Sequence, residues 1–205
     1  MPLDLVLRQG RLTGSDEAPV DIGVADGRIV DIAPHIVADA PEQQLDGRLV
    51  IPGFVETHIH LDKSCILERC NCERGTLEEA IETVAAAKRS FTEADIHARA
   101  QRTLEKAIIQ GTTRMRTHVE VDPRVGLNGF HAVRALKRDY AWALDLQICV
   151  FPQEGLTNDP GTEELLVEAC EQGADVIGGC PYTDTDPAAP AMSVGLAAHL
   201  FEMHP

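Results

Sequence analysis

The stretch VIPGFVETHIHLDK, residues 50–63, places two histidines two positions apart in a run that is otherwise mostly apolar or β-branched. Because side chains alternate across a β-strand, this spacing predicts a strand over residues 53–60 with His58 and His60 on the same face. The alternation assigns the neighbours to two faces: Glu56 and Asp62 with the histidines, and Val55, Thr57, Ile59 and Leu61 opposite. Two imidazoles on one face can bind one divalent ion, so His58 and His60 are the candidate metal ligands. The alternative is a pair of strand histidines satisfied by ordinary hydrogen bonds.

Downstream of this strand, helical and strand patterns alternate. Thr76 opens a Thr-Leu-Glu-Glu capping box that predicts a helix, and Thr92 and Gly111 mark the two ends of the next one. The predicted strands cover 53–60, 113–121, 144–151 and 175–180, and the predicted helices cover 77–90, 92–110, 129–141, 162–172 and 193–203. This order predicts an α/β fold of about four parallel β/α units. Because a closed (β/α)₈ barrel usually takes about 250 residues, we expect either an open sheet or the N-terminal part of a (β/α)₈ TIM-type barrel.

The first fifty residues have a different pattern. Short apolar runs at 3–12 and 20–33 predict strands, and Asp26-Gly27 between two such runs predicts a tight hairpin. We therefore expect two parts, a small β-sandwich segment over 1–50 and the barrel segment over 51–205.

Composition excludes several classes of partner. The chain of 205 residues is 44% hydrophobic and 25% charged, which is typical of a globular protein. Lys and Arg total 18 against 33 Asp and Glu, and the formal net charge of −15 argues against nucleic-acid binding. The sequence has no secretory signal pattern and no apolar run long enough to span a membrane. The expected location is the cytoplasm, with no membrane partner.

Polar residues recur at the ends of the next two predicted strands. His118 and Glu120 are two positions apart in the predicted strand, so their side chains share one face. In a barrel that face would point toward the barrel axis, as the face of His58 and His60 would. His118-Val119-Glu120 also matches the H-x-E of nucleoside-type zinc deaminases, but the P-C-x-x-C run which that signature requires does not follow, so that fold is excluded. Gln153 has an amide that can donate to and accept from a planar ring, unless it is a loop glutamine facing water.

Taken together, five segments resemble the metal-dependent amidohydrolase superfamily, and within it the cytosine deaminase-like branch: VIPGFVETHIHLDK, RGTLEEAI, RMRTHVEVD, LQICVFPQEG and GADVIGGCPY. The resemblance implies that His58 and His60 are the first two ligands of a divalent transition metal ion, Zn or Fe. It also implies that Gln153 hydrogen-bonds the substrate heterocycle, that the backbone of Leu77 touches the substrate, and that His118 lies in the substrate site.

The family completes its site with a third metal-binding histidine, a catalytic glutamate, another histidine and a metal-binding aspartate from later strands, which this sequence does not contain. The catalytic residues are therefore unknown, the general acid/base glutamate is expected beyond residue 205, and we expect a truncated, inactive part. The implied function is that of a hydrolase of carbon–nitrogen (non-peptide) bonds, which deaminates a cytosine-like small-molecule heterocycle through a metal-activated water. The alternatives are an N-alkyl-aminotriazine-type amidohydrolase and a non-catalytic half-barrel remnant. Because a half-barrel leaves unpaired strand edges, we also expect a homo-oligomer.

Overall fold

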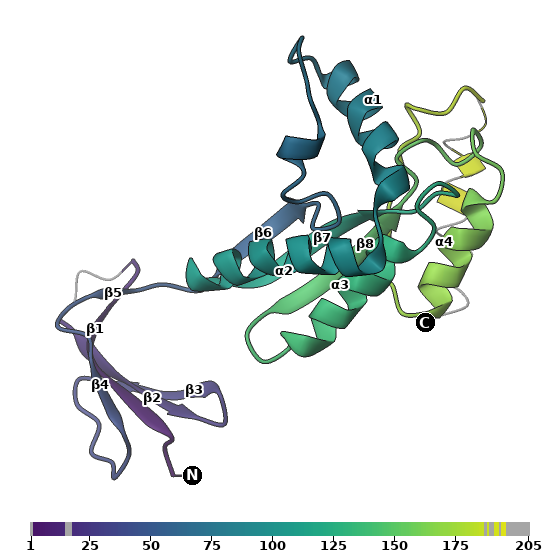
Figure 1. Cartoon of the computed structure of the whole chain (residues 1–205). Coiled ribbons are helices and arrows are strands. Elements are labelled where there is room, and N and C mark those ends of the chain that lie inside the picture. The colour runs from purple at the N-terminus through teal and green to yellow at the C-terminus, as the bar shows by residue number, and fades with distance from the viewer. Residues whose placement is uncertain (1, 15–17, 187, 189–190, 193, 196–205) are drawn as a thin grey trace. The chain divides into compact units, whose positions relative to one another are not determined.

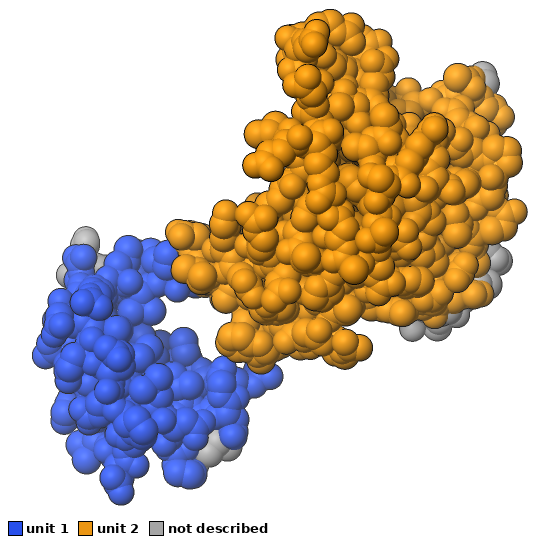
Figure 2. Space-filling view, in the orientation of Figure 1, with its two compact units in different colours: residues 1–52 blue, residues 53–205 orange. Residues whose placement is uncertain are grey.

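The computed structural model describes residues 2–14, 18–186, 188, 191–192 and 194–195. It divides the chain into two compact units, residues 1–52 and residues 53–205, which Figure 2 shows in blue and orange. Unit 1 contains β-strands, and unit 2 alternates strands and helices (Figure 1).

Unit 1 is a small sheet built around its first strand. The strands are β1 (Leu5–Leu12), β2 (Val20–Ala25), β3 (Arg28–Ala33), β4 (Glu42–Gln44) and β5 (Leu49–Val50). They lie in the order β3-β2-β1-β4, and β5 also pairs with β1. The predicted hairpin is confirmed: β2 and β3 are antiparallel, and Asp26 and Gly27 between them have φ angles of 49° and 70°. Both residues adopt the left-handed conformation that a tight two-residue hairpin needs.

Unit 2 begins with the histidine strand, β6 (Phe54–Ile59). The other elements follow in chain order: η1 (Leu67–Arg69), α1 (Leu77–Ala87), η2 (Lys88–Ser90), α2 (Glu93–Ile109), β7 (Thr112–Glu120), α3 (Asn128–Asp139), β8 (Asp145–Phe151), α4 (Thr162–Glu171) and β9 (Val176–Ile177). The strands form one parallel sheet in the order β6-β7-β8-β9. The predicted succession of parallel β/α units is therefore confirmed.

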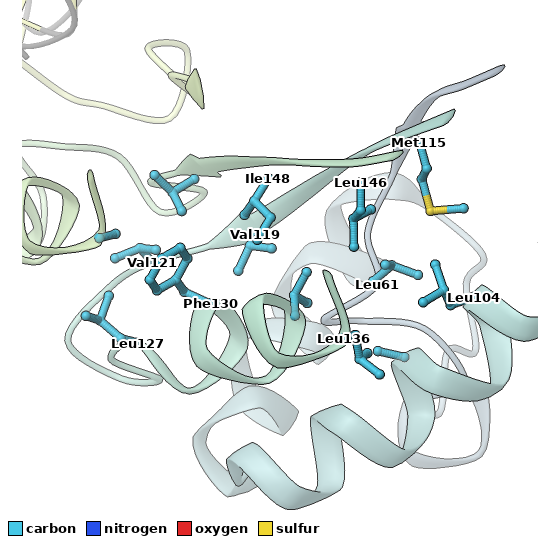
Figure 3. Close-up of a cluster of buried hydrophobic side chains, with 14 of the residues drawn as sticks. Leu61, Leu104, Met115, Val119, Val121, Leu127, Phe130, Leu136, Leu146 and Ile148 are labelled. Atoms are coloured by element: carbon cyan, nitrogen blue, oxygen red, sulfur yellow. The ribbon is translucent and has the colours of Figure 1, made fainter. Parts of the chain in front are cut away.

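The core of unit 2 lies between this sheet and its helices. In Figure 3, Val119 from β7 and Ile148 from β8 face Phe130 of α3, whereas Met115 from β7 lies at the other end of the cluster, near Leu61 and Leu104 of α2. These side chains are 2% exposed or less. Alternate residues of β7 and β8 thus bury an apolar face under α2 and α3, and this leaves the opposite face of the sheet to the polar residues.

Strict alternation along β6 is wrong. Val55 pairs with Arg114 and Ile59 pairs with Thr117, so the register shifts by one residue between Glu56 and Ile59. An extra residue of this kind reverses which face the side chains take on its two sides. Val55 and Leu61, which strict alternation places on one face, differ accordingly: Val55 is 60% exposed and Leu61 is fully buried.

Two element boundaries differ from prediction. The last strand is shorter than the expected 175–180, since β9 covers Val176–Ile177. The first predicted helix, 77–90, ends as an α-helix at Ala87 and continues as the short 3₁₀ helix η2. The helix expected at 193–203 lies for the most part outside the described residues. Among the described residues, no helix is both long and apolar enough to span a membrane.

Candidate active site

Three histidines lie together where the first two strands of the parallel sheet end. His58 is in β6, His60 follows that strand directly, and His118 is in the second half of β7. The ring centroids of His58 and His60 are 5.4 Å apart, those of His58 and His118 are 4.0 Å apart and stacked, and those of His60 and His118 are 5.7 Å apart. The residues selected from the sequence thus form one cluster of imidazoles at the carboxyl ends of adjacent strands.

The environment of His60 suits a metal ligand. Its Nδ1 is buried and has no hydrogen-bond partner among the described residues. Burial, helped by the nearby positive charge of Lys63, lowers the pKa of His60 to about 3. The imidazole is therefore neutral at neutral pH, which is the form that coordinates a metal ion. In the described part of the chain, no group of three or more His, Cys, Asp or Glu side chains is arranged to hold a metal ion.

His118 and Phe151 line the same cluster from the next two strands. Burial, followed by the proximity of His58, lowers the pKa of His118, and its Nδ1 likewise has no partner among the described residues. The ring of Phe151, at the end of β8, lies 5.5 Å from that of His60 and 6.1 Å from that of His118. Phe151 therefore gives the polar cluster an apolar wall.

Gln153 lies two residues beyond β8, and its side chain is hydrogen-bonded to the segment that follows β9. Its amide Nε2 donates to Cys180 Sγ at 3.3 Å, and Cys180 is buried. The loop that follows is held by Asp184, whose carboxylate accepts from the backbone N–H groups of Leu156 at 2.9 Å and Thr157 at 2.7 Å. Gln153 is thus on a loop held by hydrogen bonds, and this loop lies at the carboxyl ends of the strands, as the histidines do.

Leu77 opens α1, and its side chain is 78% exposed. The predicted cap of this helix is confirmed, because Thr76 Oγ1 accepts from the Glu79 N–H at 3.2 Å. Glu79 in turn accepts from the backbone N–H groups of Glu73, Arg74 and Gly75, at 2.7 to 2.8 Å. This arrangement fixes the backbone just before Leu77, and its contact with substrate stays a prediction.

A buried group of charges beside these residues was not predicted. We call it the lysine cluster, and it consists of Lys63, Lys88, Glu120, Asp122 and Glu154. Lys88 Nζ lies 3.2 Å from Glu120 Oε2, 2.6 Å from Asp122 Oδ2 and 2.7 Å from Glu154 Oε1. Lys63 donates to the other carboxylate oxygen of Glu120. Glu120, which its parity with His118 predicted to point toward the axis of the histidines, therefore belongs to an ion-pair network that joins the end of β7 to neighbouring loops.

Asp62 lies apart from the histidine rings, contrary to the expected alternation. Its Oδ2 accepts from the Glu120 N–H at 2.9 Å, and a Cβ at Gly129 of α3 would lie 3.3 Å from its own Cβ. Burial, followed by the charge of Glu120, raises the pKa of Asp62 above its ordinary value. This carboxyl group joins the loop after β6 to β7. The two-residue period ends before Asp62 because β6 stops at Ile59 and the chain then turns, with the Lys63 N–H donating to the His60 carbonyl at 3.3 Å.

Comparison with known proteins agrees with this geometry. Residues 42–137 match a family model described as the amidohydrolase family. The chain is 30% identical over 182 residues to the N-isopropylammelide isopropyl amidohydrolase of Pseudomonas sp. (strain ADP), covering 86% of this chain and 45% of that protein. It is 31% identical over 173 residues to a pterin deaminase of Rhizobium rhizogenes, covering 81% of this chain and 39% of that protein.

The structure of 5-methylcytosine deaminase from Klebsiella pneumoniae, liganded with 5-fluorocytosine, superimposes with a TM-score of 0.86 at 36% identity. That match covers 97% of this chain and 48% of the deaminase. The chain thus spans about half the length, or less, of the relatives that it matches. On these sequence and structural similarities, the chain belongs to the amidohydrolase superfamily and carries the N-terminal portion of its barrel fold.

Proposed function

We propose that this chain supplies part of the active site of a metal-dependent hydrolase that deaminates a cytosine-like nitrogen heterocycle. The observation that carries the proposal is the cluster of His58, His60 and His118, whose ring centroids are 4.0 to 5.7 Å apart. The cluster lies at the carboxyl ends of the strands, where Gln153 also lies. Active sites of β/α barrels lie at the carboxyl ends of the strands, where these residues are.

His58 and His60 are the residues that would hold the metal. The unpartnered Nδ1 and the low pKa of His60 support this assignment, because a neutral imidazole is ready to coordinate without losing a proton. When bound, a divalent ion of this kind acts as a Lewis acid that makes water nucleophilic at neutral pH. Imidazole suits both zinc and iron.

The remaining residues would bind and orient the ring. The amide of Gln153 presents both a donor and an acceptor, which matches a heterocycle that carries adjacent O and N–H groups. Phe151 lines the side next to His60 and His118 with an apolar surface. Fixing a planar substrate between such groups lowers the entropy cost of reaction, so Gln153 is expected to act mainly through orientation.

A second candidate is removal of an alkylamine from an N-alkyl-aminotriazine. Similarity to the N-isopropylammelide isopropyl amidohydrolase favours it, since 86% of this chain aligns with that protein. Both candidate reactions break an exocyclic carbon–nitrogen bond and need the same half-site.

The test uses the protein as it is naturally encoded, loaded with zinc or with iron. Release of ammonia is measured with cytosine, 5-methylcytosine and pterin, and release of isopropylamine with N-isopropylammelide. We expect one of these substrates to be hydrolysed and about one metal ion per chain to be bound, as for a mononuclear site with protein ligands. The His58→Ala, His60→Ala double variant is expected to lose both the metal, by elemental analysis, and the activity.

Gln153→Ala separates metal binding from substrate binding. It is expected to retain the metal and to raise KM, because it removes the proposed contact with the ring. Metal-free protein from both the parent and the double variant, with no hydrolysis of any substrate, would leave the non-catalytic remnant as the correct description.

A further inference from the structure

Lys88 is a lysine that the sheet and its loops enclose almost completely. Its side chain is 2% exposed, and the three carboxylates around it come from the end of β7 (Glu120), the loop after β7 (Asp122) and the loop after β8 (Glu154). Lys88 itself follows α1 directly, at the start of η2. One ammonium group therefore joins the end of α1 to residues 120–122 and to the loop after β8, which are distant from it in sequence.

Each of these segments also carries a residue of the candidate site. Glu120 lies two positions after His118, Glu154 follows Gln153 directly, and Lys88 is the C-terminal cap of the helix that begins at Leu77. Lys63, three positions after His60, completes the link by donating to Glu120. Lys63, Glu120 and Glu154 therefore lie within three residues of His60, His118 and Gln153, respectively.

The physical cost of this arrangement indicates a specific role. Removing an ammonium group from water is expensive, and a buried ion pair is often no more stabilising than apolar side chains of the same volume. Charged hydrogen bonds instead fix the direction in which the bonded groups lie. Lys88 Nζ donates two such bonds, to Glu120 Oε2 and to Glu154 Oε1. The contact with Asp122, at 2.6 Å, adds charge compensation.

We infer that Lys88 is a positioning residue, which fixes the loop of Gln153 against β7 through Glu154 so that the Gln153 amide is held ready for the heterocycle. This inference rests on the proposed function. Lys88 touches no reacting atom, and its effect reaches the substrate only through the loop. The same bond holds the C-terminal end of α1, the helix that begins at Leu77.

The test measures kcat and KM in the naturally encoded, metal-loaded protein. The substrate is whichever of cytosine, 5-methylcytosine, pterin and N-isopropylammelide the parent hydrolyses fastest. The variants are Lys88→Met, Glu154→Gln and their combination, and Glu164→Gln on the exposed side of α4 is the matched control. Elemental analysis of each variant reports whether the metal is retained.

We expect Glu154→Gln to raise KM about tenfold with a smaller change in kcat, the size typical of losing a residue that orients a ligand group. The Lys88→Met, Glu154→Gln double variant is expected to have the KM of Lys88→Met alone, because both substitutions remove the same ion pair between Lys88 and Glu154. Glu164→Gln should match the parent. If Lys88→Met does not fold, the KM of Glu154→Gln still tests the positioning role. That variant is expected to fold, because Lys88 remains paired with Glu120 and Asp122.

An unchanged KM in Glu154→Gln, or a loss of kcat alone in proportion to the folded fraction, would overturn the positioning role and leave the proposed function intact. The positioning role would also be overturned if the increase in KM of the double variant equalled the product of the increases in the two single variants. A parent that hydrolyses none of the four substrates would instead refute the proposed function, and the inference with it.

Discussion

Asp21, in β2 of unit 1, is a buried carboxylate whose charge is held by hydrogen bonds. Burial alone raises its pKa, but the bonds from Arg8 and from the backbone N–H groups of Ile36 and Gln9 outweigh burial and lower the pKa to about 2. The Arg8 Nη1 donates to Asp21 Oδ2 at 2.5 Å, and the backbone donors lie at 3.1 Å. Glu42 and His35 are the other charged or titratable neighbours.

This carboxylate predicts acid sensitivity of unit 1. The ordinary pKa of 3.8 applies in the unfolded chain, so unfolded Asp21 binds a proton at a higher pH than folded Asp21 does. The stability that it contributes is present above a pH of about 4 and is lost as the pH falls toward about 2. We expect the NMR signals of the folded unit 1 to disappear over that window.

Asp21→Asn provides the control. It is expected to be less stable at neutral pH and to unfold with a weaker dependence on pH below 4, since the titrating group is gone. An acid transition of the same steepness in both proteins would assign the titration to another carboxylate.

Residue patterns predicted the histidines but not the charges around them. His58 and His60 stand out because two imidazoles interrupt an apolar run. Their spacing of two residues is enough to predict that they share one face of the strand. Lys88 follows Val-Ala-Ala-Ala near the end of a predicted helix, where a basic residue ordinarily interacts with the helix dipole in solvent. Its burial depends on carboxylates 32 to 66 positions away, and no local period encodes those contacts.

At the scale of elements, α2 depends on its cap. Thr92 Oγ1 accepts from the Asp95 N–H at 3.3 Å, and the 17-residue helix that follows packs its buried face, including Leu104, on the sheet. We expect Thr92→Ala to lower the free energy of unfolding by about 1 kcal/mol, measured by urea denaturation. Thr92→Ser keeps the acceptor oxygen and should retain most of that stability, whereas equal losses in both variants would show that the methyl group matters instead.

The start of β6 depends on a glycine for a different reason. A Cβ at Gly53 would lie 2.3 Å from both Cγ2 and Oγ1 of Thr113, in the strand next to it. Because Thr113 is β-branched and stiff, we expect Gly53→Ala to cost about 1 to 3 kcal/mol, the range typical of overpacking. The measurement is the shift in the urea midpoint.

Relief by a second substitution tests that account. Thr113→Ala removes the two closest atoms and leaves its own Cβ, which would be 2.8 Å away, so it should recover part of the loss. No recovery in the Gly53→Ala, Thr113→Ala double variant would point to backbone flexibility at Gly53 rather than to the contact.

Element identity was more predictable than element geometry. Capping residues located α1 and α2 because Thr76 and Thr92 accept local N–H groups, a short-range effect that the sequence states directly. The register shift between Glu56 and Ile59 is a property of the β6-β7 pair, so a pattern read along β6 alone could not include it. β4 and β5 were missed for the same reason, since each short strand is defined by pairing with β1.

At the scale of the molecule, the sheet of unit 2 has two ends. In the described part of the chain, β6 pairs only with β7 and β9 pairs only with β8. Phe54 and Val55 on β6 are 56% and 60% exposed, so apolar side chains accompany unpaired backbone groups at that edge. An edge of this kind is a template for pairing with another chain unless charge or cover prevents it.

We therefore predict that the 205-residue chain by itself forms dimers or larger species at micromolar concentration, measured by sedimentation. Val55→Lys should lower the average mass toward that of the monomer, because a charge at an edge strand opposes strand addition. Val37→Lys is the matched control: Val37 is 90% exposed and belongs to unit 1, outside the sheet that contains β6. A stable monomer of the parent chain, or equal dissociation by both lysines, would show that the β6 edge does not drive association.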